Sequence, residues 1–255
     1  VTGVVVNSDT TFTALGHGID PLGNDVTYPA YTGEQASVAI DVISPDTLVG
    51  ISTSAATVYA GNAITLTVTE KNTGDVNLTG ANVVVDHGVG TLSAPPTSGD
   101  DGDGILEPDE TWSWTVTGVV VNSDTTFTAL GHGIDPLGND VTYPAYTGEQ
   151  ASVAIDVISP DTLVGISTSA ATVYAGNAIT LTVTEKNTGD VNLTGANVVV
   201  DHGVGTLSAP PTSGDDGDGI LEPDETWSWT VTGVVINSDT TFTALGHGID
   251  PLGND

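Results

Sequence analysis

Apolar and polar residues alternate with a period of two along most of the chain. Residues 64–69 read ITLTVT, residues 112–117 read WSWTVT, and residues 37–42 read SVAIDV. Successive side chains of a β-strand point to opposite faces, so this alternation predicts strands with one buried and one solvated face. The polar positions are rich in threonine, whose branched side chain suits a pleated sheet. The pattern therefore indicates antiparallel β-sheets.

The sequence repeats itself every 115 residues. The segment VTGVVVNSDTTFTALGHGIDPLGND begins at Val1, and it begins again at Val116 and at Val231. The one difference we find between the copies is Ile236, which stands where the earlier copies have valine. A unit of 115 residues has the size of a domain rather than of a solenoid repeat, so the sequence predicts an array of domains.

Each repeat contains about seven predicted strands, separated by clusters of Gly, Asn, Asp and Pro that favour turns. No convincing helical stretch remains between them. This spacing of strands is typical of an immunoglobulin-like β-sandwich, although cysteine is absent and no disulfide can join the two sheets. The predicted fold class is therefore all-β, a tandem array of such sandwiches. The strands are expected at residues 48–54, 63–71, 79–86, 111–121, 125–131 and 151–158, with shorter ones at 56–59, 91–94 and 141–146.

The composition is strongly acidic. Two basic residues stand against 33 acidic ones, which gives a formal charge of -31. Such a field repels nucleic acids and anionic membranes, and divalent cations are its natural partners. The sequence has no apolar run of membrane-spanning length and no signal-peptide pattern, and it begins without Met inside a repeated segment, as expected of a window on a longer or processed protein.

The strongest chemical signal is the acidic loop, residues 100–110, which reads DDGDGILEPDE. Its spacing resembles the second half of an EF-hand-type calcium loop, with alternating oxygen ligands, a glycine turn, a backbone carbonyl and a closing glutamate. The first position of that frame falls on Gly99, so Asp100 or a carbonyl oxygen has to supply the first ligand. The alternative is a solvated acidic loop without an ion, because motif matches give false positives.

The predicted cofactor is Ca²⁺ with a structural role, since it would locally neutralise the self-repelling charge. The acidic loop recurs one period later. The candidate ligands of the first copy are Asp100, Asp101, Asp103, the carbonyl of Ile105, Glu107 and Glu110. Those of the second copy are Asp215, Asp216, Asp218, the carbonyl of Ile220, Glu222 and Glu225.

Three motifs together support a family resemblance. The segments NTGDVNLTGANVVVD, GDDGDGILEPDETW and GIDPLGNDVTYPA occur in this order within each full repeat. They resemble the conserved-repeat domains, of the DUF11 type, that are strung along large prokaryotic surface proteins. The resemblance implies extracellular tandem Ig-like modules that act as stalks, adhesins or cell-wall structure and not as catalysts. It also implies that a domain begins near Ser44.

A domain start near Ser44 divides the chain into three parts. Residues 1–43 are expected to hold the closing strands of a preceding repeat, residues 44–158 a complete Ig-like domain, and residues 159–255 a second domain without its closing strand. We interpret this as an arbitrary window on a longer array. The alternative is that a strand from residues 36–43 of one molecule completes the last domain of another. Pairing of that strand within its own chain would exclude strand donation.

The remaining residues do not indicate catalysis. No nucleophile elbow, phosphate loop or zinc-protease helix is present, so an enzyme is not expected. Trp112 and Trp114 share a strand face and are expected in the core, although a sugar-stacking platform is the alternative. The function expected is a structural repeat of an extracellular, cell-surface fibre, stalk or array, and the alternative is an adhesin or carbohydrate-binding module. The expected partners are neighbouring copies of the chain, with glycans as further candidates and without nucleic acid or membrane insertion in this window.

Overall fold

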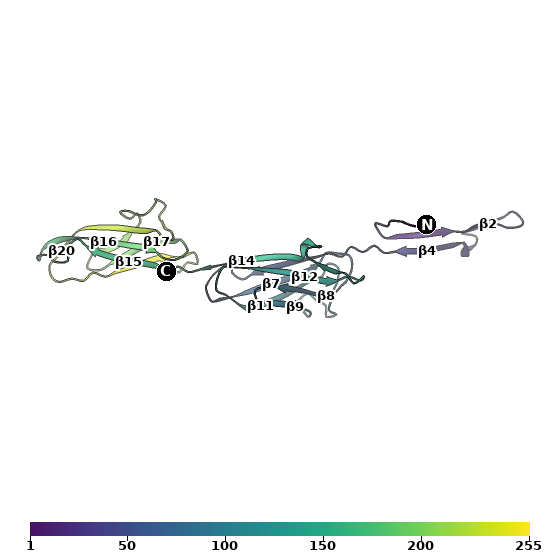
Figure 1. The fold of residues 1–255 in the computed structure, drawn as a ribbon, viewed down its shortest axis with the longest axis horizontal. Helices are drawn as coiled ribbons and strands as arrows, with labels where there is room; N and C mark the ends of the chain where they lie inside the picture. The colour runs from purple at the N-terminus through teal and green to yellow at the C-terminus, as the bar shows by residue number, and fades with distance from the viewer. The chain divides into compact units, whose positions relative to one another are not determined.

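The computed structural model describes residues 1–255. The protein is all-β, as the sequence predicted, and its only helical segments are two short 3-10 turns, η1 (Thr32–Glu34) and η2 (Thr147–Glu149). Neither of these turns has the length and apolar character that crossing a membrane requires. The strands pair into separate sheets that together form tandem β-sandwiches (Figure 1).

The sheets lie in three stretches of sequence: the N-terminal segment (residues 1–43), the middle sandwich (44–158) and the C-terminal sandwich (159–255). The contacts of the chain also divide it into two compact units, and the border between the units runs within strands of the middle sandwich. The domain boundaries read from the repeat therefore stay a prediction. One unit comprises Val1–Ser52, Leu66–Val116 and Phe127–Val153, and the other comprises Thr53–Thr65, Thr117–Thr126 and Ala154–Asp255.

The N-terminal segment consists of two strand pairs. Strand β1 (Thr10–Leu15) pairs antiparallel with β4 (Gln35–Ile40), and β2 (His17–Ile19) pairs with β3 (Asp25–Thr27). All six residues of β4 are exposed to solvent. Because β4 pairs within its own chain, the structure argues against the strand-donation alternative.

The middle sandwich has two sheets. The larger sheet has a five-strand path to which two further strands are added, β13 (Asp140–Thr142) on β12 and β9 (Gly90–Ser93) on β8. In order, that path is β10 (Ile105–Leu106), β8 (Leu78–Val85), β12 (Thr125–Ile134), β14 (Gln150–Ile158) and β6 (Thr57–Tyr59). The smaller sheet has the order β11 (Thr111–Val121), β7 (Asn62–Asn72) and β5 (Thr47–Thr53).

The C-terminal sandwich repeats this plan with fewer strands. In the smaller sheet β16 lies between β15 and β20, and in the larger sheet β17 pairs with β18, β19 and β21. Among the described residues, which end at Asp255, no strand pairs with β21 as β14 pairs with β12. The strands are β15 (Thr162–Thr168), β16 (Asn177–Asn187), β17 (Leu193–Val200), β18 (Gly205–Ser208), β19 (Ile220–Leu221), β20 (Thr226–Ile236) and β21 (Ala244–Ile249).

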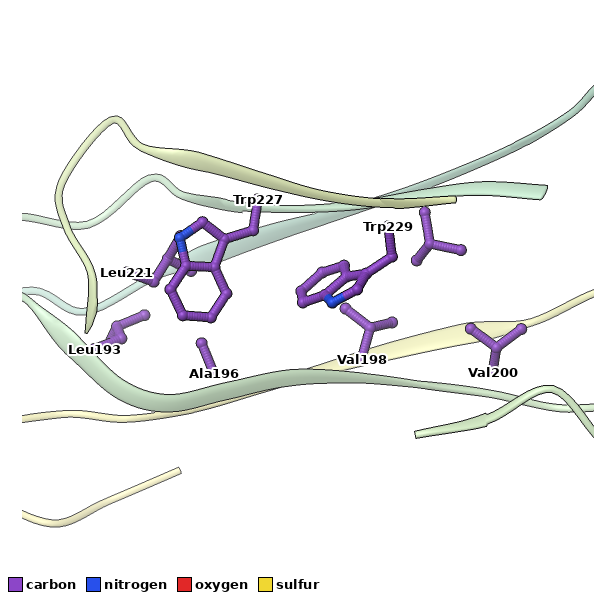
Figure 2. Packing of buried hydrophobic residues seen from close by; sticks show 8 residues of the cluster. Leu193, Ala196, Val198, Val200, Leu221, Trp227 and Trp229 are labelled. Carbon is purple, nitrogen blue, oxygen red and sulfur yellow. The ribbon is translucent and has the colours of Figure 1, made fainter. Parts of the chain in front are cut away.

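Tryptophan side chains fill the space between the two sheets of each sandwich. Trp227 and Trp229 point from β20 toward Ala196 and Val198 of β17 (Figure 2). Their rings meet edge to face with centroids 6.1 Å apart, an arrangement that aromatic pairs prefer. In the middle sandwich Trp112 is 0% exposed, which confirms that the alternating tryptophans belong to the core.

One predicted strand is shorter in the structure. The sequence pattern predicted a strand over residues 141–146, but β13 ends at Thr142. Pro144 has no N–H to donate to a neighbouring strand, so it disfavours a continued ladder. The N–H of Tyr146 instead donates to the carbonyl of Thr142 at 3.1 Å and starts the turn that leads into η2. This turn places Glu149 at the start of β14.

Candidate metal centre

Glycines shape the acidic loop of the middle sandwich. Gly99 has φ = +107°, and the carbonyl oxygen of Thr111 occupies the place that a Cβ on Gly99 would need. Gly102 and Gly104 also have positive φ, at 109° and 75°. Only glycine adopts such angles without strain, so the loop bends where its glycines stand. This explains why Gly99 holds the position at which an EF-hand frame would have a carboxylate.

Asp100 is held in place by backbone N–H groups of its own loop. Its Oδ1 accepts hydrogen bonds from the N–H of Gly102 at 3.0 Å and from the N–H of Gly104 at 3.2 Å, which wraps the loop around this carboxylate. The ligand atoms of Asp100, Asp101 and Asp103 all lie within 4.8 Å of one another. The structure therefore brings together the three aspartates that the sequence nominated in this loop.

The two glutamates of the loop lie beside these aspartates. Burial raises the pKa of Glu107, and the negative charges of Asp103, Asp101 and Glu110 raise it further. The side chain of Glu110 folds back, so that its Oε2 accepts a hydrogen bond from the N–H of Glu107 at 3.0 Å. One oxygen of Glu110 therefore already closes a turn.

Asn72 anchors the loop to the sandwich. Its side chain is fully buried, and its Nδ2 donates to the carbonyls of Val76 and Leu106, both at 2.8 Å. Its backbone N–H donates to the carbonyl of Glu110 at 3.0 Å, and its carbonyl accepts from the N–H of Asp109 at 3.1 Å. The sequence analysis did not single out Asn72. The signal that could have identified it is its inward position in the period-two pattern of β7.

The second acidic loop has the same geometry. The Oδ1 of Asp215 accepts from the N–H groups of Gly217 at 3.0 Å and Gly219 at 3.2 Å. The ligand atoms of Asp215, Asp216 and Asp218 lie within 4.8 Å of one another. Burial and the charges of Asp216, Asp218 and Glu225 raise the pKa of Glu222. The buried Asn187 donates to the carbonyl of Leu221 at 2.9 Å, as Asn72 does in the first copy.

The donor set of each loop suits a hard cation. The side chains gathered here offer oxygen atoms only, and oxygen is the donor that Ca²⁺ and Mg²⁺ prefer. The two carbonyl candidates lie in short strands at the loop ends, Ile105 opposite Thr79 and Ile220 opposite Thr194. A cation among the aspartates would offset their mutual repulsion, so the residues present fit such an ion.

The two lysines of the chain also lie at these loops. Lys71 Nζ is 3.7 Å from Asp109 Oδ1, and Lys186 Nζ is 3.3 Å from Asp224 Oδ1. Both aspartate side chains are 94% exposed, so water screens the pairs and each contributes little to stability. Neither lysine forms an ion pair with the clustered aspartates of its loop, which in the first copy are Asp100, Asp101 and Asp103.

A second acidic group escaped the sequence reading. Glu70 and Glu149 are both 0% exposed, and no N–H or hydroxyl group donates to their four carboxylate oxygens, so the only hydrogen bond open to the pair is one through a proton that the two carboxylates share. Burial raises the pKa of Glu70, and the charge of Glu149 raises it further. Burial likewise raises the pKa of Glu149. Glu70 occupies an inward position of the period-two pattern of β7, which is the signal that could have identified it.

Comparisons with known proteins give a limited result. No protein-family model matches the sequence, and no curated protein matches it either. Among solved structures, a tetra-tandem repeat in the extending region of a large adhesion protein is similar at 22% identity and a TM-score of 0.28, over 97% of this chain and 54% of that one. FdeC, an Escherichia coli adhesin, is similar at 14% identity and a TM-score of 0.30, over 97% and 82% of the two chains.

Red sea bream transglutaminase is also similar, at 11% identity and a TM-score of 0.27, over 82% of this chain and 29% of that one. The chain thus spans about half of the adhesion-protein repeat structure and less than a third of the transglutaminase. At these TM-scores the similarity carries no argument about what the chain does.

Proposed function

We propose that the chain is a structural repeat of an extracellular, cell-surface array in which each acidic loop holds a Ca²⁺ ion that stiffens its sandwich. The observation that carries this proposal is the cluster formed by Asp100, Asp101 and Asp103, whose ligand atoms lie within 4.8 Å of one another. The cluster recurs with the same hydrogen bonds in the second copy. A site that returns once per repeat suits a structural role along an array.

The proposed ion would act through the connections of the loop. The loop is tied to β7 through Asn72, and it continues directly into β11, which carries Trp112 and Trp114. An ion that fixes Asp100, Asp101 and Asp103 would therefore limit the movement of the core strand that follows. The charge of -31 gives a second reason, because bound cations lower the self-repulsion of the chain.

The surface role has support in the sequence. Tandem near-identical domains, the acidic charge and the resemblance to conserved-repeat domains of prokaryotic surface proteins all favour it. The partners we propose are further copies of the same repeat, joined along the array, and the adhesin alternative adds glycans. Antibody labelling of intact, unpermeabilised cells that produce the protein tests the location, and labelling only after permeabilisation would contradict it.

The calcium part of the proposal is tested on the whole chain by thermal unfolding, in chelator and in added CaCl₂. We expect calcium to raise the melting temperature. At a tenfold excess over Kd, binding adds about 1.4 kcal/mol per site to the free energy of unfolding. The paired changes Asp101→Asn and Asp103→Asn, with Asp216→Asn and Asp218→Asn, should remove the part of the increase that the two loops contribute.

The matched control is Asp109→Asn with Asp224→Asn. These changes also remove a carboxylate from each loop, but from an exposed position outside the aspartate cluster. The control should keep the calcium response. An identical melting curve in chelator and in calcium would overturn the proposal.

A further inference from the structure

Every unpartnered buried side-chain oxygen of the middle sandwich belongs to three residues. They are the four carboxylate oxygens of Glu70 and Glu149 and the hydroxyl oxygen of Thr47. Thr47 is 1% exposed, and both glutamates are 0% exposed. Buried polar groups normally have partners, and a buried charge without one is costly. A proton shared by the two carboxylates would satisfy two of these five oxygens, so the others still point to a missing partner.

The two carboxylates face the same point. Gly131 of β12 has no side chain, and both glutamates reach into the space that its Cβ would occupy. Glu70 Oε1 lies 2.9 Å from that position, and Glu149 Oε2 lies closer still. The two oxygens are therefore less than about 5 Å apart, which is within the span of two ligands on one cation with metal–oxygen distances of about 2.3–2.6 Å.

Thr47 is a candidate third donor, because it lies next to the turn that carries Glu149. The place of a Cβ on Gly148, next to Glu149 in the chain, is 2.5 Å from the carbonyl oxygen of Thr47. In the C-terminal sandwich the counterpart of Thr47 is Thr162, and the hydroxyl of Thr162 lowers the pKa of Glu185, the counterpart of Glu70, against the larger raising effect of burial. The sequences around these residues are the same, and in the middle sandwich the hydroxyl of Thr47 has no hydrogen-bond partner, so it is free to contact a bound cation.

No positively charged side chain acts on Glu70 or Glu149. The charges that act on Glu149 are those of Asp46 and Asp140, and both are negative. His132 of β12 is engaged with Asp140, with 3.4 Å between Nδ1 and Oδ2. A proton or a cation therefore has to neutralise the two glutamates.

We propose that Glu70, Glu149 and Thr47 form a second cation site, inside the middle sandwich and separate from the acidic loop. All five donors are oxygens, so the site selects a hard divalent cation, for which Ca²⁺ is the probe. The site joins β5, β7 and the start of β14, so the bound ion links the first, a central and the last strand of the sandwich.

The repeats supply matched controls for this site. Glu34 is the counterpart of Glu149 in the N-terminal segment, and it approaches Gly16 as Glu149 approaches Gly131. The N-terminal segment has no counterpart of Glu70. Glu185 is the counterpart of Glu70, and the sequence stops before a counterpart of Glu149. Glu34 and Glu185 therefore each correspond to one glutamate of the pair, in the same surrounding sequence but without the other glutamate.

The experiment uses the whole chain with both acidic loops neutralised by Asp101→Asn, Asp103→Asn, Asp216→Asn and Asp218→Asn, so its outcome does not depend on calcium in the loops. Equilibrium dialysis counts bound Ca²⁺ at pH 7.5. We expect Glu70→Gln and Glu149→Gln each to remove one equivalent, while Glu34→Gln and Glu185→Gln remove none. Glutamine keeps the shape of the side chain and stays neutral, and circular dichroism verifies folding.

Two further readouts separate a cation site from a shared proton. Binding at the glutamate pair should release protons, seen as a calorimetric heat that changes with the ionisation heat of the buffer, and Glu149→Gln should remove this part. Thr47→Val should weaken binding about tenfold. Equal Ca²⁺ counts in the Glu149→Gln and Glu34→Gln chains would overturn the proposal and leave the pair with a proton only.

Discussion

The middle and C-terminal sandwiches have nearly the same sequence but not the same structure. Residues 44–140 and 159–255 differ only at Ile236, where the middle sandwich has Val121. Nevertheless, Thr57–Tyr59 forms strand β6, whereas the identical residues 172–174 form no strand. Strand β12 begins at Thr125, whereas its counterpart β21 begins only at Ala244. The difference must therefore arise outside the compared sequence.

Strand β14 accounts for the difference. In the middle sandwich, Asp156–Ile158 pairs in parallel with Thr57–Tyr59, and the N–H of Val157 donates to Asp124 Oδ1 at 2.8 Å. Strand β14 also lies next to β12 in the sheet. The C-terminal sandwich has no such strand, and a groove lined by residues from 168–175 and 236–242 lies at the corresponding place. One strand thus organises two of its neighbours, because strand formation depends on partners more than on local sequence.

The largest expected effect concerns one phenylalanine. Phe127 is 2% exposed, whereas its counterpart Phe242 is only partly buried. Phe127→Ala should lower the free energy of unfolding of the middle sandwich by about 4 kcal/mol, because a buried aromatic side chain leaves a cavity. Phe242→Ala should lower that of the C-terminal sandwich by roughly half as much. Equal losses of unfolding free energy in the two variants would show that the different burial of Phe127 and Phe242 does not affect stability.

The two sandwiches can be followed separately by hydrogen exchange. Peptides that span Val121 and Ile236 differ in mass by one methylene group, although the surrounding sequences are identical. Their exchange rates under native conditions report the opening free energy of each sandwich. The same peptides serve the other predictions.

A somewhat smaller effect is expected from β14 itself. Ile155 is 2% exposed, whereas Ile40, at the same place of the repeat in β4, is 40% exposed. Ile155→Ala should destabilise the middle sandwich by about 3 kcal/mol and loosen β6. The matched change Ile40→Ala should leave both reporter peptides unchanged. If the peptide that spans Val121 kept its protection in Ile155→Ala, β14 would not be what stabilises this part of the sandwich.

Features that do not depend on β14 should respond equally. Asn72 and Asn187 are both 0% exposed and make the same hydrogen bonds. Asn72→Ala and Asn187→Ala should each cost about 2 kcal/mol in their own sandwich, because buried carbonyl groups lose their donor. Urea denaturation followed through the reporter peptides measures both. Clearly unequal losses would show that β14 also affects the stability of residues far from the groove.

The smallest effect concerns pH in chelator. Burial raises the pKa of Glu70 and Glu149 above the value of 4.5 in the unfolded chain, so the folded state keeps protons that the unfolded state releases. This contribution to the free energy of unfolding is therefore fully present below pH 4.5, and the free energy should fall as pH rises from 5 to 8. Glu70→Gln should flatten this slope.

The C-terminal sandwich sharpens the pH prediction. It holds one buried glutamate of this kind, Glu185, whose pKa burial also raises. Its stability should therefore fall less steeply between pH 5 and 8 than that of the middle sandwich. Exchange of the two reporter peptides at several pH values, corrected for the intrinsic exchange rate, measures both slopes. A steeper fall in the C-terminal sandwich would contradict the assignment to the glutamate pair.

Much of the fold followed from the period-two pattern, because that pattern records which face of a strand is buried. The alternation around Trp112 and Trp114 correctly placed both in the core. The strand predicted at residues 56–59 forms as β6, but the identical residues 172–174 form no strand, since β14 is present only beside the first copy. Local pattern does not carry this information.

The candidate site was partly readable for a similar reason. The aspartates of the acidic loop are neighbours in sequence, so their spacing already indicated that they meet. Glu70 and Glu149 come together from distant strands around Gly131, and no local motif connects them. Asn72 resembled a turn residue, and only its burial shows that it anchors the loop.

The anchoring by Asn72 has a consequence for how such a gene can change in length. The hydrogen bonds that tie the acidic loop to the sandwich all join residues between Asn72 and Ser113, well inside one period of 115 residues. A recombination event that gains or loses one period, wherever its breakpoints fall, therefore rebuilds each loop together with its own asparagine. A change in the number of repeats would therefore leave the hydrogen bonds between asparagine and loop unchanged in every remaining repeat.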